Sequence, residues 1–257
     1  MRMEPKGPAG TGLELWPAMS AAELESGSPV QHGHMYLDDK ATGLCSGVWT
    51  CTAFTGKMGP YSVSEFMLLL EGSVTIREAS GRETTINAGE SFVIPKGLVC
   101  QWVQTGFVRK FFVIFEDASG ARAKDPAALK VLKTDTKVKL GRSEGPDAAL
   151  VVGGVPPVWH DHQLFADPTG QLMVGVWETT PYERKPIDFP RHELMHILSG
   201  EVALTGGEPD SAQVFKAGDT LLVSMGSRMA WKNATPVRKI YCIFLPKKVA
   251  AVRSAAE

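Results

Sequence analysis

Short apolar runs separated by glycine and proline make up most of this chain, and long amphipathic stretches are rare. Residues 66–70 are all apolar, a bend follows at Gly72, and residues 73–77 alternate polar and apolar positions. This pattern predicts two strands around a glycine turn. Residues 91–94 and 111–115 predict further short strands. Many short strands between glycine and proline turns are typical of a sandwich or closed barrel, so we predict an all-β fold.

The strand pattern occurs twice. Residues 47–115 reappear as residues 175–244, displaced by 128 or 129 positions, which indicates an internal duplication. The repeated residues are Trp49, Lys57, Glu65, Gly72, Trp102, Arg109 and Lys110 in the first copy and Trp177, Lys185, Glu193, Gly200, Trp231, Arg238 and Lys239 in the second. Shared positions indicate a common scaffold or pocket, and positions that differ are where the functions of the two copies can have diverged.

The duplication sets the predicted domain boundaries. We predict an N-terminal barrel with its extension over residues 1–122, a linker over 123–157 and a C-terminal barrel over 158–257. Each half of the 257 residues is close to the usual size of a domain with its own core. Helical patterns are confined to residues 21–24 and, in the linker, to residues 126–132.

The spacing of glutamate, glycine and proline carries a family resemblance. Glu65 is followed after six residues by Gly72, and Gly89 is followed by Pro95 and Gly97. The second half repeats the pattern with Glu193, Gly200, Gly218 and Gly226, but has Ser224 in place of the proline. These motifs resemble those of the cupin superfamily, which implies two tandem jelly-roll barrels, a bicupin. Residues 97–102 and 108–110 resemble the branch with ureidoglycine aminohydrolase and the ethanolamine-utilisation cupins.

The chain departs from metal-binding cupins at the metal ligands. The resemblance implies two histidines before the glutamate and a third after the second glycine motif. The first half has Gly59, Pro60, Tyr61 and Cys100 at these places, and the second half has Ile187, Asp188, Phe189 and Met229. Because a catalytic metal centre needs about three imidazole or carboxylate ligands, one glutamate per half is insufficient. We therefore expect no metal and no other cofactor.

Duplicated histidine pairs are the alternative ligand set for a divalent metal. His32 and His34 recur as His160 and His162, and residues two apart on a strand project from one face. Both pairs lie far upstream of the glutamate, which also fits histidines with a hydrogen-bonding or exposed role. His192 and His196 differ in strand parity from Glu193, so we expect both on the opposite face.

Strand parity places a pocket inside each barrel. If Glu65 points inward, so do Met67 and the opposing Cys100 and Trp102. The glutamates, Glu65 and Glu193, are the candidate catalytic groups, as acid or base in an apolar pocket. The candidate ligand-binding residues are Tyr61, Met67, Cys100, Trp102, Met195, Met229, Trp231, Lys57 and Lys185.

A structural role for the glutamates is equally consistent with the sequence. Glu65 can form a buried ion pair with Arg109 or Lys110, and Glu193 can do so with Arg238 or Lys239. Conservation of these residues between the two copies fits such pairs as well as it fits two active sites.

Composition narrows the class of protein. The formal charge is −1 and 44% of residues are hydrophobic, so we expect no nucleic-acid partner. The chain lacks an 18-residue apolar run, and residues 1–7 lack the apolar core of a signal peptide, so we expect no membrane partner and a cytoplasmic location. The four cysteines have no metal-ligand spacing, which favours reduced thiols. Sheet edges that need covering make a homodimer an expectation.

Two functions remain open from the sequence. The first is a metal-poor bicupin that binds a small polar metabolite in the barrel pocket, with a catabolic or regulatory role. The alternative is a metal-dependent small-molecule enzyme resembling ureidoglycine aminohydrolase. The missing histidines favour the first, and the family resemblance supports the second. Whether either barrel is catalytic, and for which substrate, stays open.

Overall fold

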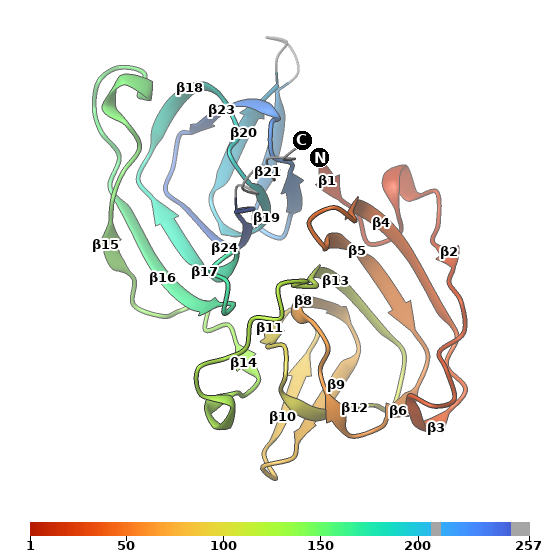
Figure 1. Cartoon of the computed structure of the whole chain (residues 1–257). Helices are drawn as coiled ribbons and strands as arrows, with labels where there is room; N and C mark the ends of the chain where they lie inside the picture. The colour runs from red at the N-terminus through yellow and green to blue at the C-terminus, as the bar shows by residue number, and fades with distance from the viewer. Residues whose placement is uncertain (207–211, 248–257) are drawn as a thin grey trace, which may run out of the picture.

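The computed structural model describes residues 1–206 and 212–247 and consists of two β-barrels in tandem (Figure 1). The strands of the N-terminal barrel are β2 (Glu14–Leu15), β3 (Leu24–Gly27), β4 (Gln31–Asp39), β5 (Leu44–Cys51), β6 (Phe54–Gly56), β7 (Gly59–Pro60), β8 (Ser64–Glu71), β9 (Ser73–Glu78), β10 (Glu83–Asn87), β11 (Ser91–Ile94), β12 (Val99–Gln104), β13 (Val108–Phe115) and β14 (Leu132–Lys133). The strands of the C-terminal barrel are β1 (Arg2–Met3), β15 (Gly141–Ser143), β16 (Trp159–Ala166), β17 (Leu172–Thr179), β18 (Tyr182–Asp188), β19 (His192–Ser199), β20 (Glu201–Thr205), β21 (Gln213–Lys216), β22 (Thr220–Val223), β23 (Arg228–Asn233) and β24 (Val237–Phe244). The prediction of an all-β, duplicated jelly-roll fold is confirmed.

Each barrel is formed by two sheets of antiparallel strands. The larger sheet has the order β14-β11-β8-β13-β5-β4-β2 in the N-terminal barrel and β1-β22-β19-β24-β17-β16-β15 in the C-terminal barrel. The smaller sheet contains β10, β9, β12, β6 and β3 in the first barrel, with β7 also paired to β12, and β18, β23, β20 and β21 in the second. The strands within the duplicated residues therefore occupy equivalent positions in the two barrels, whereas the edge strands β14 and β1 come from different parts of the chain.

The N-terminal segment and the linker each contribute strands to the barrels. Strand β1 pairs with β22, so Arg2 and Met3 belong to the C-terminal barrel although the sequence analysis assigned residues 1–122 to the N-terminal one. In the linker, β14 pairs with β11 of the first barrel and β15 pairs with β16 of the second. Pairing with β1 covers an edge strand that would otherwise leave its backbone groups unpaired.

The linker and the N-terminal extension contain turns where helices were predicted. Within residues 126–132 only Pro126–Ala128 form a 3-10 turn, η2, in which the backbone amide of Ala127 donates to the Asp125 carboxylate, and Leu132 begins β14. Residues 21–23 form a turn, and Leu24 is the first residue of β3. The other 3-10 turns are η1 (Pro8–Gly10) and η3 (Ala148–Leu150). The prediction of helices was wrong because short apolar spacings cannot outweigh the strand pairing on either side. None of the helices in the described ranges is long and apolar enough to span a membrane.

The larger sheets of the two barrels pack against each other through apolar side chains. The shared core includes Leu68, Val113 and Phe115 from the first barrel and Leu194 and Phe244 from the second. The Phe115 and Phe244 ring centroids lie 4.9 Å apart. The outward positions of β8 and β19 are thus buried between the barrels, while the inward positions face two separate interiors.

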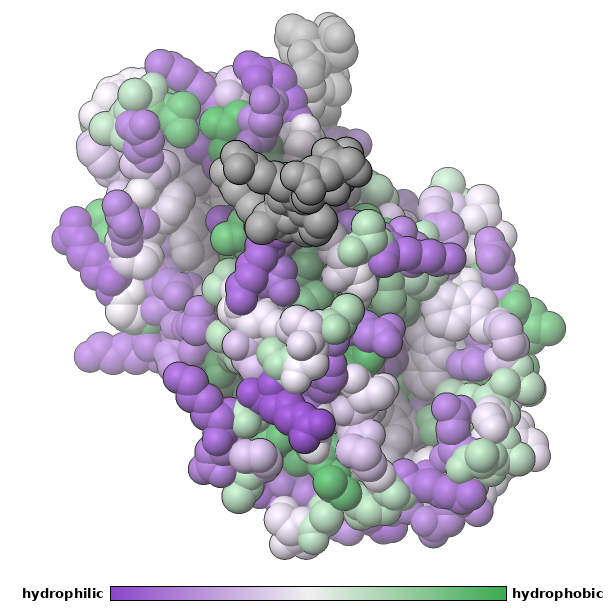
Figure 2. All heavy atoms as spheres, in the orientation of Figure 1, coloured by the Kyte–Doolittle hydropathy of each residue, from purple (hydrophilic) through white to green (hydrophobic). Residues whose placement is uncertain are grey.

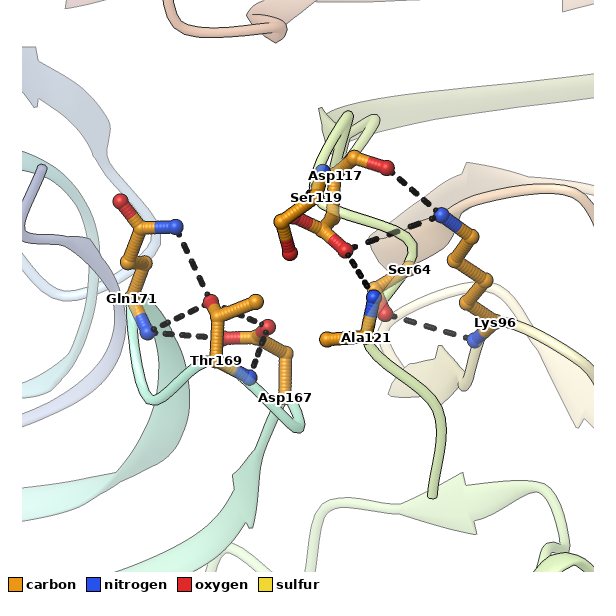
Figure 3. Close-up of polar contacts among 8 residues, drawn as sticks. All are labelled: Ser64, Lys96, Asp117, Ser119, Ala121, Asp167, Thr169 and Gln171. Carbon is orange, nitrogen blue, oxygen red and sulfur yellow. Dashed lines mark hydrogen bonds and ion pairs between the residues drawn. The ribbon is translucent and has the colours of Figure 1, made fainter. Parts of the chain in front are cut away.

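Two aspartate-centred turns lie where chain segments leave the sheets (Figure 3). The Asp167 carboxylate accepts hydrogen bonds from the backbone amides of Thr169, Gln171 and Leu172, which closes the turn between β16 and β17. The Asp117 carboxylate accepts from the backbone amides of Ser119 and Ala121 after β13. Short acidic side chains commonly close turns in this way. Both turns fix the ends of strands that build the contact between the barrels.

The molecular surface is mixed in polarity on the face shown in Figure 2. Apolar and polar side chains are interspersed over the described residues of this face (Figure 2). Exposed large apolar side chains include Phe107 and Val99. A homodimer stays a prediction.

Candidate functional site

A buried carboxylate–lysine pair lies at the same place in each barrel. Glu65 on β8 and Lys110 on β13 point into the N-terminal barrel, and Oε1 of Glu65 lies 2.7 Å from Nζ of Lys110. Glu193 on β19 and Lys239 on β24 repeat this pair at the same 2.7 Å separation. Both carboxylates are nearly inaccessible to solvent, with exposed fractions of 4% and 1%.

Parity explains why the arginines take no part in these pairs. Arg109 precedes Lys110 on β13, so it points outward, where its Nη1 lies 3.2 Å from Oε2 of Glu71. Arg238 pairs with Glu178 in the same way, at 2.9 Å, and also donates to the linker carbonyls of Thr136 and Val138. The interpretations that pair Glu65 with Arg109 and Glu193 with Arg238 were therefore wrong.

The second carboxylate oxygen has a different partner in each barrel. In the first barrel, Oε2 of Glu65 accepts a hydrogen bond from the hydroxyl of Tyr61. In the second barrel, Oε2 of Glu193 lies 2.9 Å from both Nε and Nη2 of Arg191. Burial alone would raise the pKa of Glu193, but Lys239 and Arg191 hold it below its ordinary value. All four carboxylate oxygens are thus occupied by partners inside the protein.

A pair of tryptophans frames each lysine. Nζ of Lys110 lies 4.8 Å from the Trp49 ring centroid and 4.9 Å from that of Trp102. Nζ of Lys239 lies 4.7 Å from Trp177 and 5.3 Å from Trp231. These distances are typical of cation–π contacts, which stabilise a desolvated ammonium group. The lysine therefore occupies the aromatic cage of each barrel.

Most predicted site residues meet in the barrel interiors. Met67 and Met195 place their sulfur atoms 3.0 and 3.2 Å from Nζ of Lys110 and Lys239. Cys100 and Trp102 pack in the first interior, and Met229 and Trp231 do so in the second. Lys57 and Lys185 do not join them, because both are exposed, and Nζ of Lys185 donates to the backbone carbonyl of Ala149 at 2.9 Å.

The Cys100 thiol is unsuited to nucleophilic catalysis. Burial raises its pKa to about 11, and the neighbouring Glu78 carboxylate adds to that shift. A thiol with this pKa is almost wholly protonated near pH 7, and the thiolate is the nucleophilic form. Cys100 therefore serves as a small apolar side chain of the wall.

The histidines lie away from both pairs. His192 and His196 face the opposite side of β19 from Glu193, as parity predicted. Nδ1 of His160 lies 3.7 Å from Oε1 of Glu178, and the His34 ring packs edge-on against Tyr36. Over residues 1–206 and 212–247, no three His, Cys, Asp or Glu side chains are grouped so that they could hold a metal ion. The residues present therefore do not fit the metal centre of other cupins.

A cavity adjoins the lysine in each barrel, and the two linings differ. The N-terminal cavity, of about 330 Å³, is lined by Met19, Glu23, Leu24, Trp49, Phe54, Tyr61, Trp102 and Lys110. The C-terminal cavity, of about 230 Å³, has a more highly charged lining that includes Ser143, Trp159, Asp161, Arg184, Arg191, Glu193, Met229 and Lys239. The first is mostly aromatic and apolar, whereas the second brings together three cations and two carboxylates.

The two cavity linings differ at one corner of the barrel, where the edge strand, β2 or β15, pairs with β4 or β16. In the first barrel Trp16 lies over Gly33, where a β-carbon would come within 2.3 Å of the indole. In the second barrel the equivalent positions are Ser143 and Asp161, which open the corner and place a carboxylate in it. Burial raises the pKa of Asp161, opposed by hydrogen bonding from Tyr241.

The sequence analysis missed the residues that distinguish the second cavity. Arg184 stands where the first copy has Gly56, Arg191 where it has Val63, and Asp161 where it has Gly33. The available signal was the comparison of the two copies, because each of these positions carries charge in only one of them. Arg191 also shares strand parity with Glu193.

Comparisons with known proteins agree with this architecture. The model of the EutQ-like cupin domain matches residues 42–112 and 166–241, more than half of the chain in one segment per barrel. No curated protein matches the chain.

Solved structures of several bacterial proteins share the fold. A Pseudomonas syringae pv. tomato protein of unknown function is 26% identical, with a TM-score of 0.75 and coverage of 92% of this chain and 94% of that one. A cupin 2 conserved barrel domain protein from Leptotrichia buccalis is 11% identical, with a TM-score of 0.53 and coverage of 86% and 91%. The E. coli protein Ylba is 13% identical, with a TM-score of 0.53 and coverage of 91% and 89%. With its two matched segments and two jelly-roll barrels, the chain belongs to the EutQ-like cupin domain family.

Proposed function

We propose that this bicupin binds a small polar metabolite in the cavity of its C-terminal barrel. The observation that carries the proposal is the lining of that cavity, in which Asp161, Arg184 and Arg191 surround a space of about 230 Å³. Ligand sites commonly combine apolar and aromatic walls with a few convergent polar groups. Trp159, Trp177 and Trp231 supply such walls here.

The glutamate pairs support the barrels rather than the ligand. Glu65 and Glu193 each have both oxygens engaged by neighbouring side chains. A general acid or base must be free to exchange a proton with the substrate. We therefore propose a positioning role for Glu193, which holds Lys239 and Arg191 in place, and a structural role for Glu65.

A thermal-shift panel tests the proposal. We expect a compound among neutral, anionic and cationic metabolites of up to about six carbons to raise the Tm of the full chain. At a concentration of 100 times Kd the ligand adds about 2.7 kcal/mol to the free energy of unfolding. The double variant Ser143→Trp with Asp161→Gly copies the corner of the first barrel and is expected to abolish the shift.

A matched variant locates the binding. Leu24→Trp fills the N-terminal cavity instead and is expected to leave the shift unchanged. A shift that survives in the C-terminal double variant but is lost in Leu24→Trp would place the ligand in the wrong barrel for this proposal. Consumption of a panel compound only after addition of a divalent metal would instead support the metal-dependent enzyme.

A further inference from the structure

One edge of the Arg184 guanidinium is buried without a hydrogen-bond partner. Among the described residues, neither its Nε nor its Nη2 has an acceptor, although both are shielded from solvent. Nε1 of Trp159 and Oγ of Ser143 are buried and unpartnered as well. All three residues line the same C-terminal cavity.

Unpaired donors of this kind need an explanation. More than 90% of buried polar groups in folded proteins have a partner, and leaving a donor unsatisfied costs about 1–3 kcal/mol, with a larger cost for a charged group. Three neighbouring residues that all lack acceptors, one of them charged, are most simply explained by an acceptor that comes from outside the chain.

The backbone around Arg184 is held in place by the linker. Strand β18 has a register shift between Arg184 and Ile187, and Val151 of the linker forms a bridge to Arg184. The backbone amide of Val152 also donates to the carbonyl of Glu183 at 2.9 Å. Ser143 and Trp159 are direct partners in the β15–β16 pairing. The donors therefore sit on paired strands, which favours a preorganised site.

The charges around the cavity favour an anion. Arg184, Arg191 and Lys239 face it, together with the carboxylates of Glu193 and Asp161. Glu193 is already shared by Lys239 and Arg191, and Asp161 is hydrogen-bonded by Tyr241. The positive charge of Arg184 has no carboxylate within ion-pair distance among the described residues. An incoming anion would balance it.

We propose that the Nε and Nη2 edge of Arg184 binds the carboxylate group of a small metabolite, with Trp159 and Ser143 as further donors. The inference rests on the proposed binding function of the C-terminal cavity and names the chemical class of its ligand. Nε–H and Nη2–H are parallel donors on one edge of the guanidinium, which matches the two oxygens of a carboxylate. The cavity volume of about 230 Å³ restricts the ligand to a few carbon atoms beyond that group.

The N-terminal barrel lacks every part of this arrangement. Gly56 replaces Arg184, and Gln31 replaces Trp159. The Gln31 side chain accepts a hydrogen bond from the Trp49 indole at 2.9 Å, so the Trp49 N–H has a partner within the protein. The Trp102 and Trp231 indoles likewise donate to Gln104 and Asn233. The Trp159 indole is thus a specific reporter of an occupant, and Trp49 is its control.

Indole N–H resonances of the full chain test the inference with acetate and acetamide as probes. The two molecules have the same shape, but only acetate is charged. We expect acetate to shift the Trp159 resonance saturably and to leave that of Trp49 in place, whereas acetamide at equal concentration has no effect. Trp159→Phe assigns the resonance. Arg184→Gln is expected to weaken acetate binding at least tenfold, and Arg184→Lys is expected to be intermediate because lysine lacks the fork.

The control variant is Arg228→Gln, which removes a positive charge from an exposed position on neighbouring β23. We expect it to bind acetate as the wild type does. Equal losses in Arg184→Gln and Arg228→Gln would overturn the inference in favour of non-specific attraction. A Trp231 indole resonance that matches the wild type shows that the C-terminal barrel of each variant is folded, because this indole donates to Asn233 in the same barrel.

The remaining outcomes separate the two proposals. Equal shifts with acetate and acetamide overturn the carboxylate assignment but leave metabolite binding intact. The carboxylate assignment also fails if acetate has no effect on Trp159 while a neutral compound in the thermal-shift panel stabilises the wild type but not the Ser143→Trp, Asp161→Gly variant. Metabolite binding would stand in that case. If no compound stabilises the protein and no probe moves Trp159, both proposals fail.

Discussion

The two barrels share their buried centre and differ at its rim. Both have a glutamate, a lysine and two tryptophans in one arrangement, with the same 2.7 Å between carboxylate and ammonium. They differ at the second carboxylate oxygen, which has Tyr61 as partner in the first barrel and Arg191 in the second. We interpret the shared centre as scaffold, and we propose that the residues that differ between the copies are where binding chemistry was added or lost.

A residue that is retained in both copies can have either a structural or a functional role. A buried ion pair is costly to disturb one partner at a time, so both members persist once the pair is formed. Repetition of Glu65 and Lys110 in the second copy follows from this constraint without any catalytic role. A buried charge without a partner, such as that of Arg184, is not explained by this constraint, because no ion pair among the described residues would be broken by its loss. Such a charge therefore points to a ligand.

Removal of either buried carboxylate should test the shared centre most strongly. Glu65→Gln and Glu193→Gln keep the side-chain shape but leave Lys110 or Lys239 without its counter-ion. We expect a loss of about 3–5 kcal/mol in the free energy of unfolding for each, measured by urea denaturation. The exposed Glu71→Gln, which only breaks the surface pair with Arg109, should lose no more than about 1 kcal/mol. A loss that small in Glu65→Gln would contradict the structural role.

The equivalence of the scaffolds can be tested at the turns after β8 and β19. Gly72 and Gly200 have φ of 79° and 77°, and a β-carbon would come within 2.1 Å of the Phe107 carbonyl oxygen or 2.2 Å of that of Pro236. We expect Gly72→Ala and Gly200→Ala to destabilise the protein by about 2–4 kcal/mol each, because backbone strain adds to the clash. Gly81→Ala, with positive φ but open space, should cost only the strain. Unequal losses at the two turns would break the equivalence.

Acid titration should distinguish the C-terminal pair. The folded-state pKa of Glu193 lies below its ordinary value, so its charge stabilises the protein above the unfolded-state pKa, and this contribution is lost as pH falls through the folded-state pKa. We expect the wild-type Tm to fall as the pH drops below about 5, and Glu193→Gln to show a smaller fall over the same range. Parallel curves for the two proteins would contradict the lowered pKa.

The smallest expected effect concerns the unpaired arginine. Arg184→Met removes a buried charge that has no internal partner, so the unliganded variant should unfold at the same free energy as the wild type or up to about 1 kcal/mol higher. Lys110→Met is the contrast, since it strands the Glu65 carboxylate and should lose several kcal/mol. Chemical denaturation without added anions measures both. A large loss in Arg184→Met would mean that Arg184 has a structural role.

The sequence predicted the centre of each barrel and missed its rim, for a physical reason. Strand parity is a local property, so Glu65, Met67 and Trp102 could be assigned to one interior, and His192 to the opposite face of its strand. The position of Arg184 at the cavity depends on a register shift in β18 and on a bridge from the linker, and neither can be predicted from the local sequence pattern. The lysine was identified only as one of two candidates, although parity relative to its neighbours separates Arg109 from Lys110.

The pairing of β1 with β22 has a consequence for how the chain acquires its structure. Arg2 and Met3 precede their partners Leu221 and Thr220 by more than 200 positions in the chain. Contacts of such large sequence separation form late and slow folding. The C-terminal half expressed alone would present β22 as an open edge, the kind of strand that recruits other chains and aggregates. The duplicated halves are thus no longer two independent folding units, because the second barrel is completed by a strand that precedes the first copy.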